Sequence, residues 1–410
     1  MLNLIVPSVV YNINFLKLWG AQILTQVALN MLYYILTIWV WESTHSNTAV
    51  GALILSFGIP AVIFGPFAGV LVDRWDTRMV IVGTNLLRTL MLPLFALALN
   101  VPPTVFVLTL AISFVTQFFI PAEGSSIPAL VKKDQLISAN SLFTLSLNTS
   151  MAVGYLMASP FLRVLGNNGT IFVIFFCFLV ATIITERLPR IPGLSGGKGF
   201  STVIAELMEG GKFIFANRTV RSAILSITLF QSLVLILASL GPGFAASVLK
   251  VAVVDVSIIV LAPAIAGVVV GTLVLPRLGK RWPERFLITI GIISGGILLA
   301  SLGLLRADLW NFDVTKVAMT ILFFLGVANS FVNVPATTMI HKLVPSDLRG
   351  RVYGIVNMLI SGVAFLPLLI VGGLADVFGV SLILVLIGFF VFFLGLYRLR
   401  RGVYTEKEVK

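Results

Sequence analysis

Charged side chains are scarce in this chain. Asp, Glu, Lys and Arg together make up 11% of its 410 residues, whereas 58% of the residues are hydrophobic. A mean hydropathy of +1.07 excludes a soluble globular protein. Apolar runs of roughly 20 residues recur along the whole chain, and each is long enough to cross the ~30 Å hydrocarbon core of a bilayer as a helix.

Reactive and metal-binding side chains are also few. The single cysteine, Cys177, can form no disulfide within the chain and lies in an apolar run, so it is interpreted as a small core residue. The two histidines, His45 and His341, lie in predicted loops far apart in the sequence, so no metal-ligand spacing is present. No nucleophile constellation or phosphate-binding loop is found either. The sequence therefore predicts no enzyme, no metal and no cofactor.

The apolar runs predict the fold class. In lipid only helices and closed barrels satisfy their backbone polar groups, and continuous rather than alternating apolarity favours helices. We predict an all-α polytopic membrane protein with twelve transmembrane helices, arranged as two pseudo-symmetric six-helix bundles. The predicted spans are approximately 14–41, 48–72, 79–99, 102–122, 138–164, 169–186, 219–247, 253–276, 285–305, 316–339, 351–375 and 379–399.

The net charge of +12 would suit a nucleic-acid partner, but the placement of the basic residues indicates another role. With a cytoplasmic amino terminus, most of them lie in cytoplasmic loops, and only Arg163, Lys250, Arg306 and Lys316 lie outside. This is the positive-inside rule. We therefore expect no nucleic-acid partner and a multi-pass protein of the inner (cytoplasmic) membrane, with both termini in the cytoplasm.

The longest polar stretch divides the chain into domains. Residues 1–186 form the predicted N-terminal six-helix bundle, and residues 219–410 form the C-terminal bundle with a short cytoplasmic tail. Residues 187–218 form a cytoplasmic linker, whose second part spaces apolar residues like a helix that lies in the membrane interface.

The two halves repeat one another, but not completely. Gly65 and Gly69 return 202 residues later, whereas Leu275 stands at the position that corresponds to Asp73. Parallel repetition of two six-helix halves is typical of transporters, in which the binding site lies between the halves near the bilayer midplane.

The loop that joins the second and third spans carries a recognisable motif. Residues 69–78 contain Asp73, Arg74, Asp76 and Arg78 within a few positions. They resemble the signature of the major facilitator superfamily, which has a glycine, an acid, an arginine and a further basic residue. The family's glycine between the acid and the last basic residue is replaced by Asp76.

Further stretches indicate a branch of that family. Residues 121–142 and 349–352 are similar to the branch that holds macrolide efflux proteins and enterobactin exporters. The glycine-proline motif that the family's antiporters carry in span five is reduced to Pro160, since Ser159 replaces the glycine.

The resemblance implies a secondary active transporter that works by alternating access. It implies export of an amphipathic small molecule (a drug, macrolide or siderophore-like compound), with protons as the coupling ion and the lipid bilayer as its surroundings. We expect a monomer. An importer or lysophospholipid flippase on the same fold, or a non-transporting sensor or scaffold, remains an alternative.

The resemblance also implies a conformational latch at the cytoplasmic end of span two. Two glycines four residues apart let another helix approach, and the acid then engages an arginine and a neighbouring helix end. The alternative is an ordinary solvated loop, in which exposed ion pairs contribute only ~0–1 kcal/mol. The predicted latch residues are Gly65, Gly69, Asp73, Arg74 and Arg78.

Uncharged amides are the candidate residues for a substrate cavity. The resemblance implies that spans one, four, seven and ten line this cavity, and a few amides among apolar residues suit a large amphipathic ligand. Amides also link helices to one another, which is the alternative role. The candidates are Gln26, Asn30, Gln117, Gln231, Asn329 and Asn333.

One intramembrane charge stands out. Arg88 lies about 15 Å along the third predicted helix, near mid-bilayer, where a charge is costly and function is the default hypothesis. It either binds substrate or ties its helix to others, with Asn85 one turn away. By these boundaries no carboxylate lies near the middle of a span, which favours neutral or anionic substrates. Glu123 comes closest, either as a coupling acid or as a loop charge that faces Lys132 or Lys133.

Overall fold

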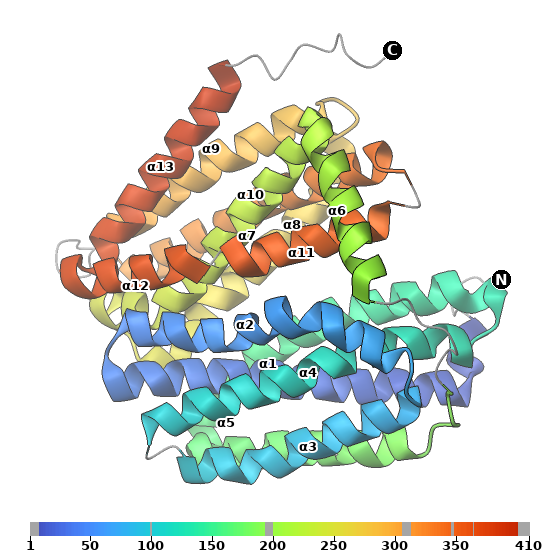
Figure 1. Cartoon of the computed structure of the whole chain (residues 1–410). Helices are drawn as coiled ribbons and strands as arrows, with labels where there is room; N and C mark the ends of the chain where they lie inside the picture. Colours follow the sequence, from blue (N-terminus) through green and yellow to red (C-terminus); the bar gives the residue numbers. More distant parts are fainter. Residues whose placement is uncertain are drawn as a thin grey trace. The chain divides into compact units, whose positions relative to one another are not determined.

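The computed structural model describes residues 8–98, 101–192, 200–305, 313–345, 348–363 and 365–400, and all regular elements in these ranges are helical (Figure 1). Residues 193–199 of the predicted linker and the predicted tail 401–410 lie outside the described residues. The α-helices are α1 (Ile13–Thr44), α2 (Asn47–Val72), α3 (Thr77–Ala98), α4 (Pro102–Leu130), α5 (Leu136–Glu186), α6 (Phe200–Ala216), α7 (Arg218–Phe244), α8 (Ala262–Leu278), α9 (Glu284–Gly303), α10 (Val314–Leu343), α11 (Arg349–Val363), α12 (Phe365–Phe378) and α13 (Val380–Arg400).

The helices correspond to the twelve predicted spans. Ten of the described helices are long and apolar enough to cross a membrane. The 51-residue α5 contains spans five and six, which meet at Gly166, where a φ of 66° places the backbone in the left-handed region that favours glycine. Helices α11 and α12 together cover span eleven, and α6 is the helix predicted in the linker. The prediction of an all-α membrane protein is confirmed.

The chain forms two compact units. The first consists of Met1–Trp39 and Leu55–Val203, and the second of Val40–Ile54 and Ile204–Lys410. The division between Val203 and Ile204 falls inside the predicted linker 187–218. The grouping of Val40–Ile54 with the second unit has no counterpart in the sequence-based division, because it depends on contacts with residues more than 300 positions away.

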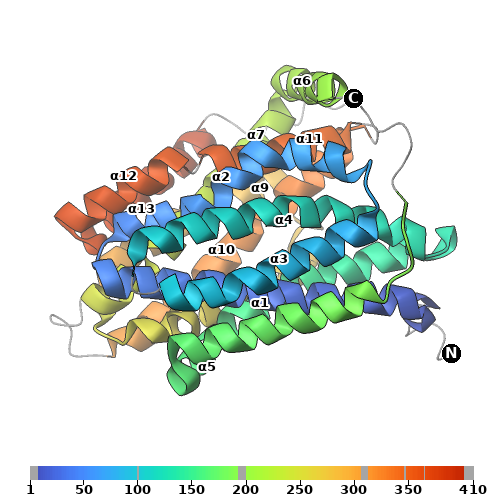
Figure 2. The same cartoon turned by 60° about the horizontal axis from the view of Figure 1, so that its bottom comes forward.

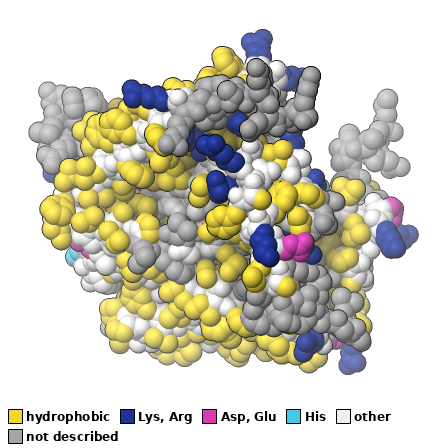
Figure 3. All heavy atoms as spheres, turned by 45° about the horizontal axis from the view of Figure 1, so that its top comes forward, with side chains coloured by type: hydrophobic (Ala, Val, Ile, Leu, Met, Phe, Trp, Pro, Cys, Tyr) yellow, Lys and Arg dark blue, Asp and Glu magenta, His cyan; other side chains and the backbone are white. Residues whose placement is uncertain are grey.

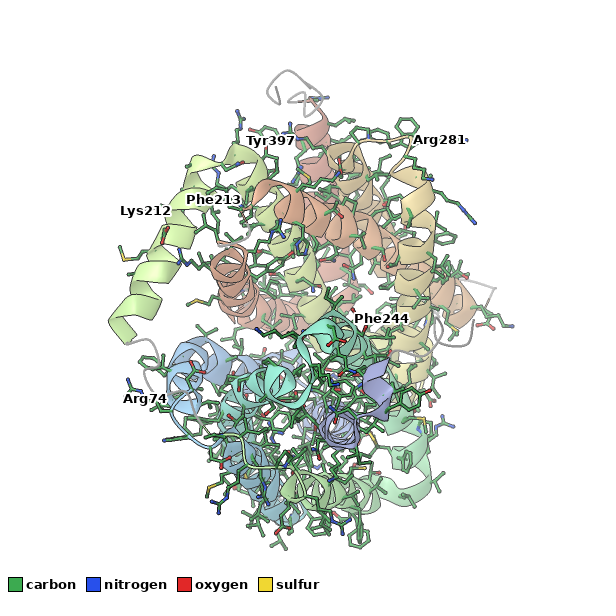
Figure 4. The ribbon with its side chains drawn as sticks, turned by 90° about the vertical axis from the view of Figure 1, so that its right-hand side faces the viewer. Arg74, Lys212, Phe213, Phe244, Arg281 and Tyr397 are labelled. Atoms are coloured by element: carbon green, nitrogen blue, oxygen red, sulfur yellow. The ribbon has the colours of Figure 1, made fainter. Side chains whose placement is uncertain are left out.

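Each unit has its own apolar core. In the first unit α3 lies alongside α4 and α5 (Figures 1 and 2), and buried side chains of these helices and α1 meet. In the second unit residues of α7, α9, α10, α11 and α13 pack together. On α6, Lys212 points away from the other helices, whereas Phe213 points toward them and packs on this core (Figure 4). Core residues include Phe15, Ile81, Phe119 and Phe143 in the first unit and Ile224, Ile292, Ile340, Val352 and Val391 in the second.

Much of the described outer surface is apolar. Hydrophobic side chains cover much of the described surface visible in Figure 3. Large apolar side chains are exposed on the helices, for example Leu97 near the end of α3 (74% exposed) and Leu273 on α8 (70% exposed). An exposed apolar surface of this extent marks contact with lipid.

Polar caps fix where two of the helices begin. Asn217 Oδ1 accepts hydrogen bonds from the backbone N–H groups of Thr219 and Val220, both at 3.1 Å, at the start of α7. Asp313 Oδ1 accepts the backbone N–H of Lys316 at 3.2 Å at the start of α10. Hydrogen bonding from the Lys316 side chain and backbone holds the pKa of the Asp313 carboxyl below its ordinary value. Such caps satisfy amide groups that have no partner within the helix.

Glycines permit the close contact between α9 and α13, which lie side by side in Figure 1. Gly296 of α9 lies against the Gly388 carbonyl of α13, Gly303 lies against the backbone of Ser381 and Val385, and Gly395 of α13 lies against Ile293 of α9. A Cβ atom on Gly388 would lie 2.7 Å from the Ala300 Cα atom, and one on Gly303 would lie within 3 Å of the opposite backbone. Small residues at such crossings let helix backbones approach, because van der Waals contact rather than the hydrophobic effect holds membrane helices together.

Replacing Gly388→Ala should therefore destabilise the protein. Forcing a methyl group into this crossing costs about 1–3 kcal/mol. The matched control is Gly83→Ala on α3, where nothing lies within 4 Å of the added atom. The control should be neutral or stabilising by up to ~1 kcal/mol, because alanine has the higher helix propensity. Thermal unfolding of the detergent-purified variants measures the difference, and equal midpoints would contradict the packing argument.

Candidate functional site

The predicted latch loop joins α2 to α3 and anchors α3. Asp76 Oδ1 accepts the backbone N–H of Arg78 at 3.0 Å and so caps α3. The Arg78 guanidinium donates from Nη2 to the backbone carbonyl of Glu186, the last residue of α5. A cation at a helix C-terminus is favoured by the helix dipole. Arg78 therefore connects the start of α3 to the end of α5.

The other latch residues make fewer contacts. Asp73 is half-buried, and its side chain forms no hydrogen bond or ion pair with the residues that the structure describes. Arg74 is exposed at the turn between α2 and α3 (Figure 4). A Cβ on Gly65 would lie 3.8 Å from the Gln117 side chain, and one on Gly69 would meet nothing within 4 Å. The latch stays a prediction, with Asp73 placed at the end of α2.

The corresponding glycines of the second unit pack much more tightly. A Cβ on Gly271 would lie 2.9 Å from the Ser330 Cβ atom of α10, and Gly267 lies directly against the Phe323 carbonyl of the same helix. Leu275, which stands in place of the acid, is buried (4% exposed). The half that lacks the acid thus has the close α8–α10 contact that the glycine spacing predicts.

Asn30 lies where α1 crosses α5. A Cβ on Gly154 of α5 would lie 2.7 Å from the Val27 carbonyl oxygen and 2.8 Å from the Asn30 Cβ atom, so only glycine allows this crossing. Asn30 is 7% exposed, and its Nδ2 donates to the backbone carbonyl of Gln26 at 2.7 Å. The Gln26 side chain is half-buried on the same helix.

A polar link beside this crossing was not predicted. Trp19 Nε1 donates to Ser146 Oγ at 2.9 Å, and the Ser146 hydroxyl donates to Gln22 Oε1 at 2.7 Å. Gln22 is fully buried. This amide therefore joins α1 to α5, which is the structural role expected of interhelical polar side chains. The sequence signal for Ser146 was its position in a series of polar residues on span five.

The structure reveals two hollows along α5 that sequence reasoning missed. One, between α1 and α5, has a volume of about 280 Å³, and the other, along the first turns of α5, has a volume of about 710 Å³. Both belong to the first unit. The first is lined by Trp19, Ile23, Val27, Leu142, Leu145, Ser146, Thr149, Ser150 and Val153, and the second by Leu136, Ile137, Asn140, Ser141, Thr144, Leu145 and Asn148.

Arg88 is fully enclosed by protein. It is 1% exposed, and its guanidinium carbon lies 4.4 Å from the Phe119 ring centroid and 5.8 Å from that of Phe178. Cation–π contacts of this kind stabilise a desolvated charge. Its Nη1 also donates to Asn85 Oδ1 at 3.3 Å, the helical neighbour expected from the sequence. Its Nε and Nη2 atoms have no hydrogen-bond partner among the described residues.

Glu123 is not a loop charge facing Lys132 or Lys133, as one alternative had it. Helix α4 continues to Leu130, well past the predicted end at residue 122, and Glu123 is 4% exposed inside it. The prolines in α4 do not end it, because proline is tolerated in membrane helices whose backbone groups find other partners. Glu123 therefore lies within the last third of α4 rather than beyond its end.

Arg88 and Glu123 share one buried environment. They lie within electrostatic range of each other but form no ion pair within 4.0 Å. The Glu123 Oε1 atom, like two of the guanidinium nitrogens, has no hydrogen-bond partner among the described residues. Buried polar atoms in native proteins are nearly always bonded, so these atoms make Arg88 and Glu123 candidate functional residues.

Of the predicted amides in the second unit, Asn329 and Asn333 are hydrogen-bonded to each other, whereas Gln231 lies on a different helix. On α10, Asn333 Nδ2 donates to the Asn329 backbone carbonyl at 3.2 Å and to its side-chain oxygen. Gln231 lies on α7, and all three side chains are half-buried. In the first unit Gln117 is 7% exposed on α4. That these amides line a substrate cavity stays a prediction.

Asp376, at the end of α12, holds the first turn of α2. Its carboxylate accepts the Ser46 hydroxyl (2.7 Å), the Asn47 backbone N–H (2.7 Å) and amide (2.9 Å), and the Thr48 backbone N–H (3.1 Å) and hydroxyl (2.7 Å). An anion is favoured at a helix N-terminus. The backbones are close as well, since a Cβ on Gly372 would lie 2.9 Å from the Asn47 carbonyl oxygen. These contacts place Val40–Ile54 in the second unit.

Replacing Asp376→Asn should loosen this attachment. The amide removes the negative charge and part of the accepting capacity, which should lower the free energy of unfolding by about 1–3 kcal/mol. Hydrogen exchange of the Asn47 and Thr48 backbone amides should accelerate in the same variant. The exposed loop residue Asp134 provides the control Asp134→Asn, which should change neither measurement. Unchanged exchange in Asp376→Asn would show that the carboxylate does not hold the segment.

Two units of apolar helices, with polar and ionisable groups enclosed inside their spans, define a multi-pass membrane transporter. The chain belongs to the Major Facilitator Superfamily, whose family model matches residues 18–367. The resemblance inferred from residues 69–78 is thereby confirmed.

Known proteins support this assignment over most of the chain. Macrolide efflux protein A of Streptococcus pyogenes is 26% identical over 382 residues, which cover 90% of this chain and 91% of that protein. Macrolide efflux protein A of Enterococcus faecalis is 28% identical over 325 residues, covering 76% and 97%. The crystal structure of the nucleoside transporter NupG aligns with a TM-score of 0.76 at 14% identity, covering 95% of this chain and 99% of that one. This last likeness shows the fold alone.

Proposed function

We propose that this protein is a secondary active transporter that exports an amphipathic small molecule, such as a macrolide, by alternating access. The observation that carries the proposal is the similarity to macrolide efflux protein A over 90% of the chain. Uncharged amides enclosed in mainly apolar helices support it, because such surroundings hold a large amphipathic ligand through a few directed bonds.

Export is driven by protons in this proposal, and Glu123 carries the coupling proton. Its carboxyl is enclosed in α4, has an oxygen without a hydrogen-bond partner and lies within electrostatic range of Arg88. Taking up a proton removes a negative charge beside the guanidinium, and losing it restores the attraction. An element whose electrostatic balance changes with one proton can bias an equilibrium between two conformations.

The proposed setting is the bacterial cytoplasmic membrane, with both termini in the cytoplasm and a single chain as the working unit. The distribution of basic residues supports this orientation. Asp73 then lies at the cytoplasmic end of α2, where it closes that side by engaging a neighbouring helix end or arginine during the cycle.

Transport in inside-out membrane vesicles tests the proposal. With an imposed proton gradient (acidic inside), vesicles that contain the protein should accumulate erythromycin above empty vesicles, and Asp73→Asn should slow the accumulation at least severalfold. Asp134→Asn, in an exposed loop, is the matched control. No accumulation of any macrolide would contradict export, and uptake by right-side-out vesicles would indicate an importer instead.

Glu123→Gln should uncouple the cycle from protons. The amide has the shape of the protonated acid but cannot release a proton, so gradient-driven accumulation should fall by roughly tenfold or more, as for loss of an essential acid–base group. Exchange of macrolide across the membrane without a gradient should persist. Glu42→Gln, at the exposed end of α1, is the control. Gradient-driven transport at the wild-type rate in Glu123→Gln would assign coupling to another residue.

A further inference from the structure

A row of exposed polar side chains runs along the first three turns of α5. Asn140, Ser141, Thr144 and Asn148 recur at a spacing of about four residues and therefore share one face of the helix. Asn148 lies about 18 Å along the helix from its first residue, deep within the thickness of a ~30 Å hydrocarbon core. Polar side chains at that depth face protein or water rather than lipid.

The hydrogen bonds of this row fix how its amides are turned. Asn140 Nδ2 donates to the Leu136 carbonyl at 2.9 Å, and Asn148 Nδ2 donates to the Thr144 carbonyl at 2.9 Å. A backbone carbonyl can only accept, so the amide nitrogen, and not the oxygen, faces the helix in both residues. Each amide then offers two oxygen lone pairs and one remaining N–H to its surroundings. The surface is richer in acceptors than in donors.

The same orientation recurs in the predicted cavity amides. Asn30, Gln117 and Asn333 each donate their side-chain nitrogen to the backbone carbonyl four residues earlier, at 2.7, 3.0 and 3.2 Å. The side-chain oxygens of Asn148, Asn30, Gln117 and Asn333 are therefore all uncharged acceptors on membrane helices. Such oxygens pair with hydroxyl or ammonium donors and repel carboxylates.

The row is continuous with an apolar and aromatic hollow. Leu145 lines both hollows of the first unit, and the smaller one adds Trp19, Ile23 and Val27 of α1. The larger hollow, about 710 Å³, falls within the size range of ligand sites, and the smaller one, about 280 Å³, lies just below that range. A surface with an apolar part and an adjoining row of acceptors is complementary to an amphipathic molecule that carries hydroxyl or ammonium groups.

We propose that this face of α5, with the adjoining hollows, contacts the transported compound and selects hydroxyl or ammonium donors on an otherwise apolar molecule. The inference rests on the proposed function and adds a surface and a chemical preference to it. It replaces the expectation of neutral or anionic substrates with neutral or cationic ones, because the enclosed Glu123 also removes the reason to exclude cations.

Access to the row is tested first, by thiol labelling. In a Cys177→Ala background, single substitutions Ser141→Cys, Thr144→Cys and Asn148→Cys are treated in inside-out vesicles with a charged maleimide. All three should react, and excess erythromycin should slow the reaction at least severalfold. Val180→Cys, on the apolar second half of α5 (42% exposed), is the control and should not react. Absence of labelling at Thr144→Cys and Asn148→Cys, or labelling that an exported compound does not slow, overturns the proposal.

Selection of donors is tested by binding. Asn148→Leu should weaken the binding of erythromycin to purified protein by about tenfold, the effect of losing one good hydrogen bond. Asn148→Asp keeps an acceptor and should bind the cationic macrolide at least as well as the wild type. Asn168→Leu, an exposed asparagine elsewhere on α5, is the matched control and should change nothing.

The outcomes separate the two proposals. Wild-type binding by Asn148→Leu overturns the assignment of α5, even where wild-type vesicles export erythromycin. Failure of wild-type vesicles to export any macrolide overturns the proposed function, and absence of the maleimide reaction at positions 144 and 148 overturns the assignment of α5 in that case as well.

Discussion

The structure depends on one constraint: inside a bilayer, a polar group must find its partner within the protein. Most polar side chains of the described spans meet it locally, by donating to the carbonyl four residues earlier, as Thr109, Thr116 and Thr182 do. Asparagine and glutamine follow the same rule with one N–H and keep an oxygen for other partners. The requirement that stabilises the helices therefore also determines which atoms of these side chains stay available for other partners.

Charges follow the constraint in two ways. Asp376 lies at a helix end, where three residues of another segment fill its lone pairs. Arg88 and Glu123 lie within the first unit. The Phe119 ring and the Asn85 amide contact the Arg88 guanidinium, but two of its nitrogens and one Glu123 oxygen have no hydrogen-bond partner among the described residues. The first arrangement is saturated and suits an attachment. In the second arrangement some hydrogen-bonding atoms have no partner. A change of partners there breaks fewer hydrogen bonds, and so costs less free energy, than it would in a fully bonded arrangement.

The two halves of the repeat have diverged in packing as well as in charge. Where the acid is missing, Gly267 and Gly271 hold α8 tightly against α10. Where Asp73 is present, Gly65 and Gly69 leave space beside them. In the second half, backbone contact holds the helices together at the position where the first half has the acid. In the half with looser glycines, the predicted latch assigns the role of that contact to Asp73.

The sequence by itself determined the helices, their number and the family. The length of an apolar run decides whether it can span a bilayer, and the charged loop motif is a local pattern that indicates the family. It located Arg88 and its neighbour Asn85, and the amides of α1, α4 and α10. It left Glu123 just beyond the predicted end of span four, as either a coupling acid or a loop charge, whereas α4 continues past Pro121 and Pro128 to Leu130. Only the tertiary structure enclosed Glu123 beside Arg88, joined Asp376 to the start of α2 and left one polar face of α5 open. These features depend on which helices meet, and contacts between residues up to 330 positions apart are set by side-chain packing rather than by any local pattern.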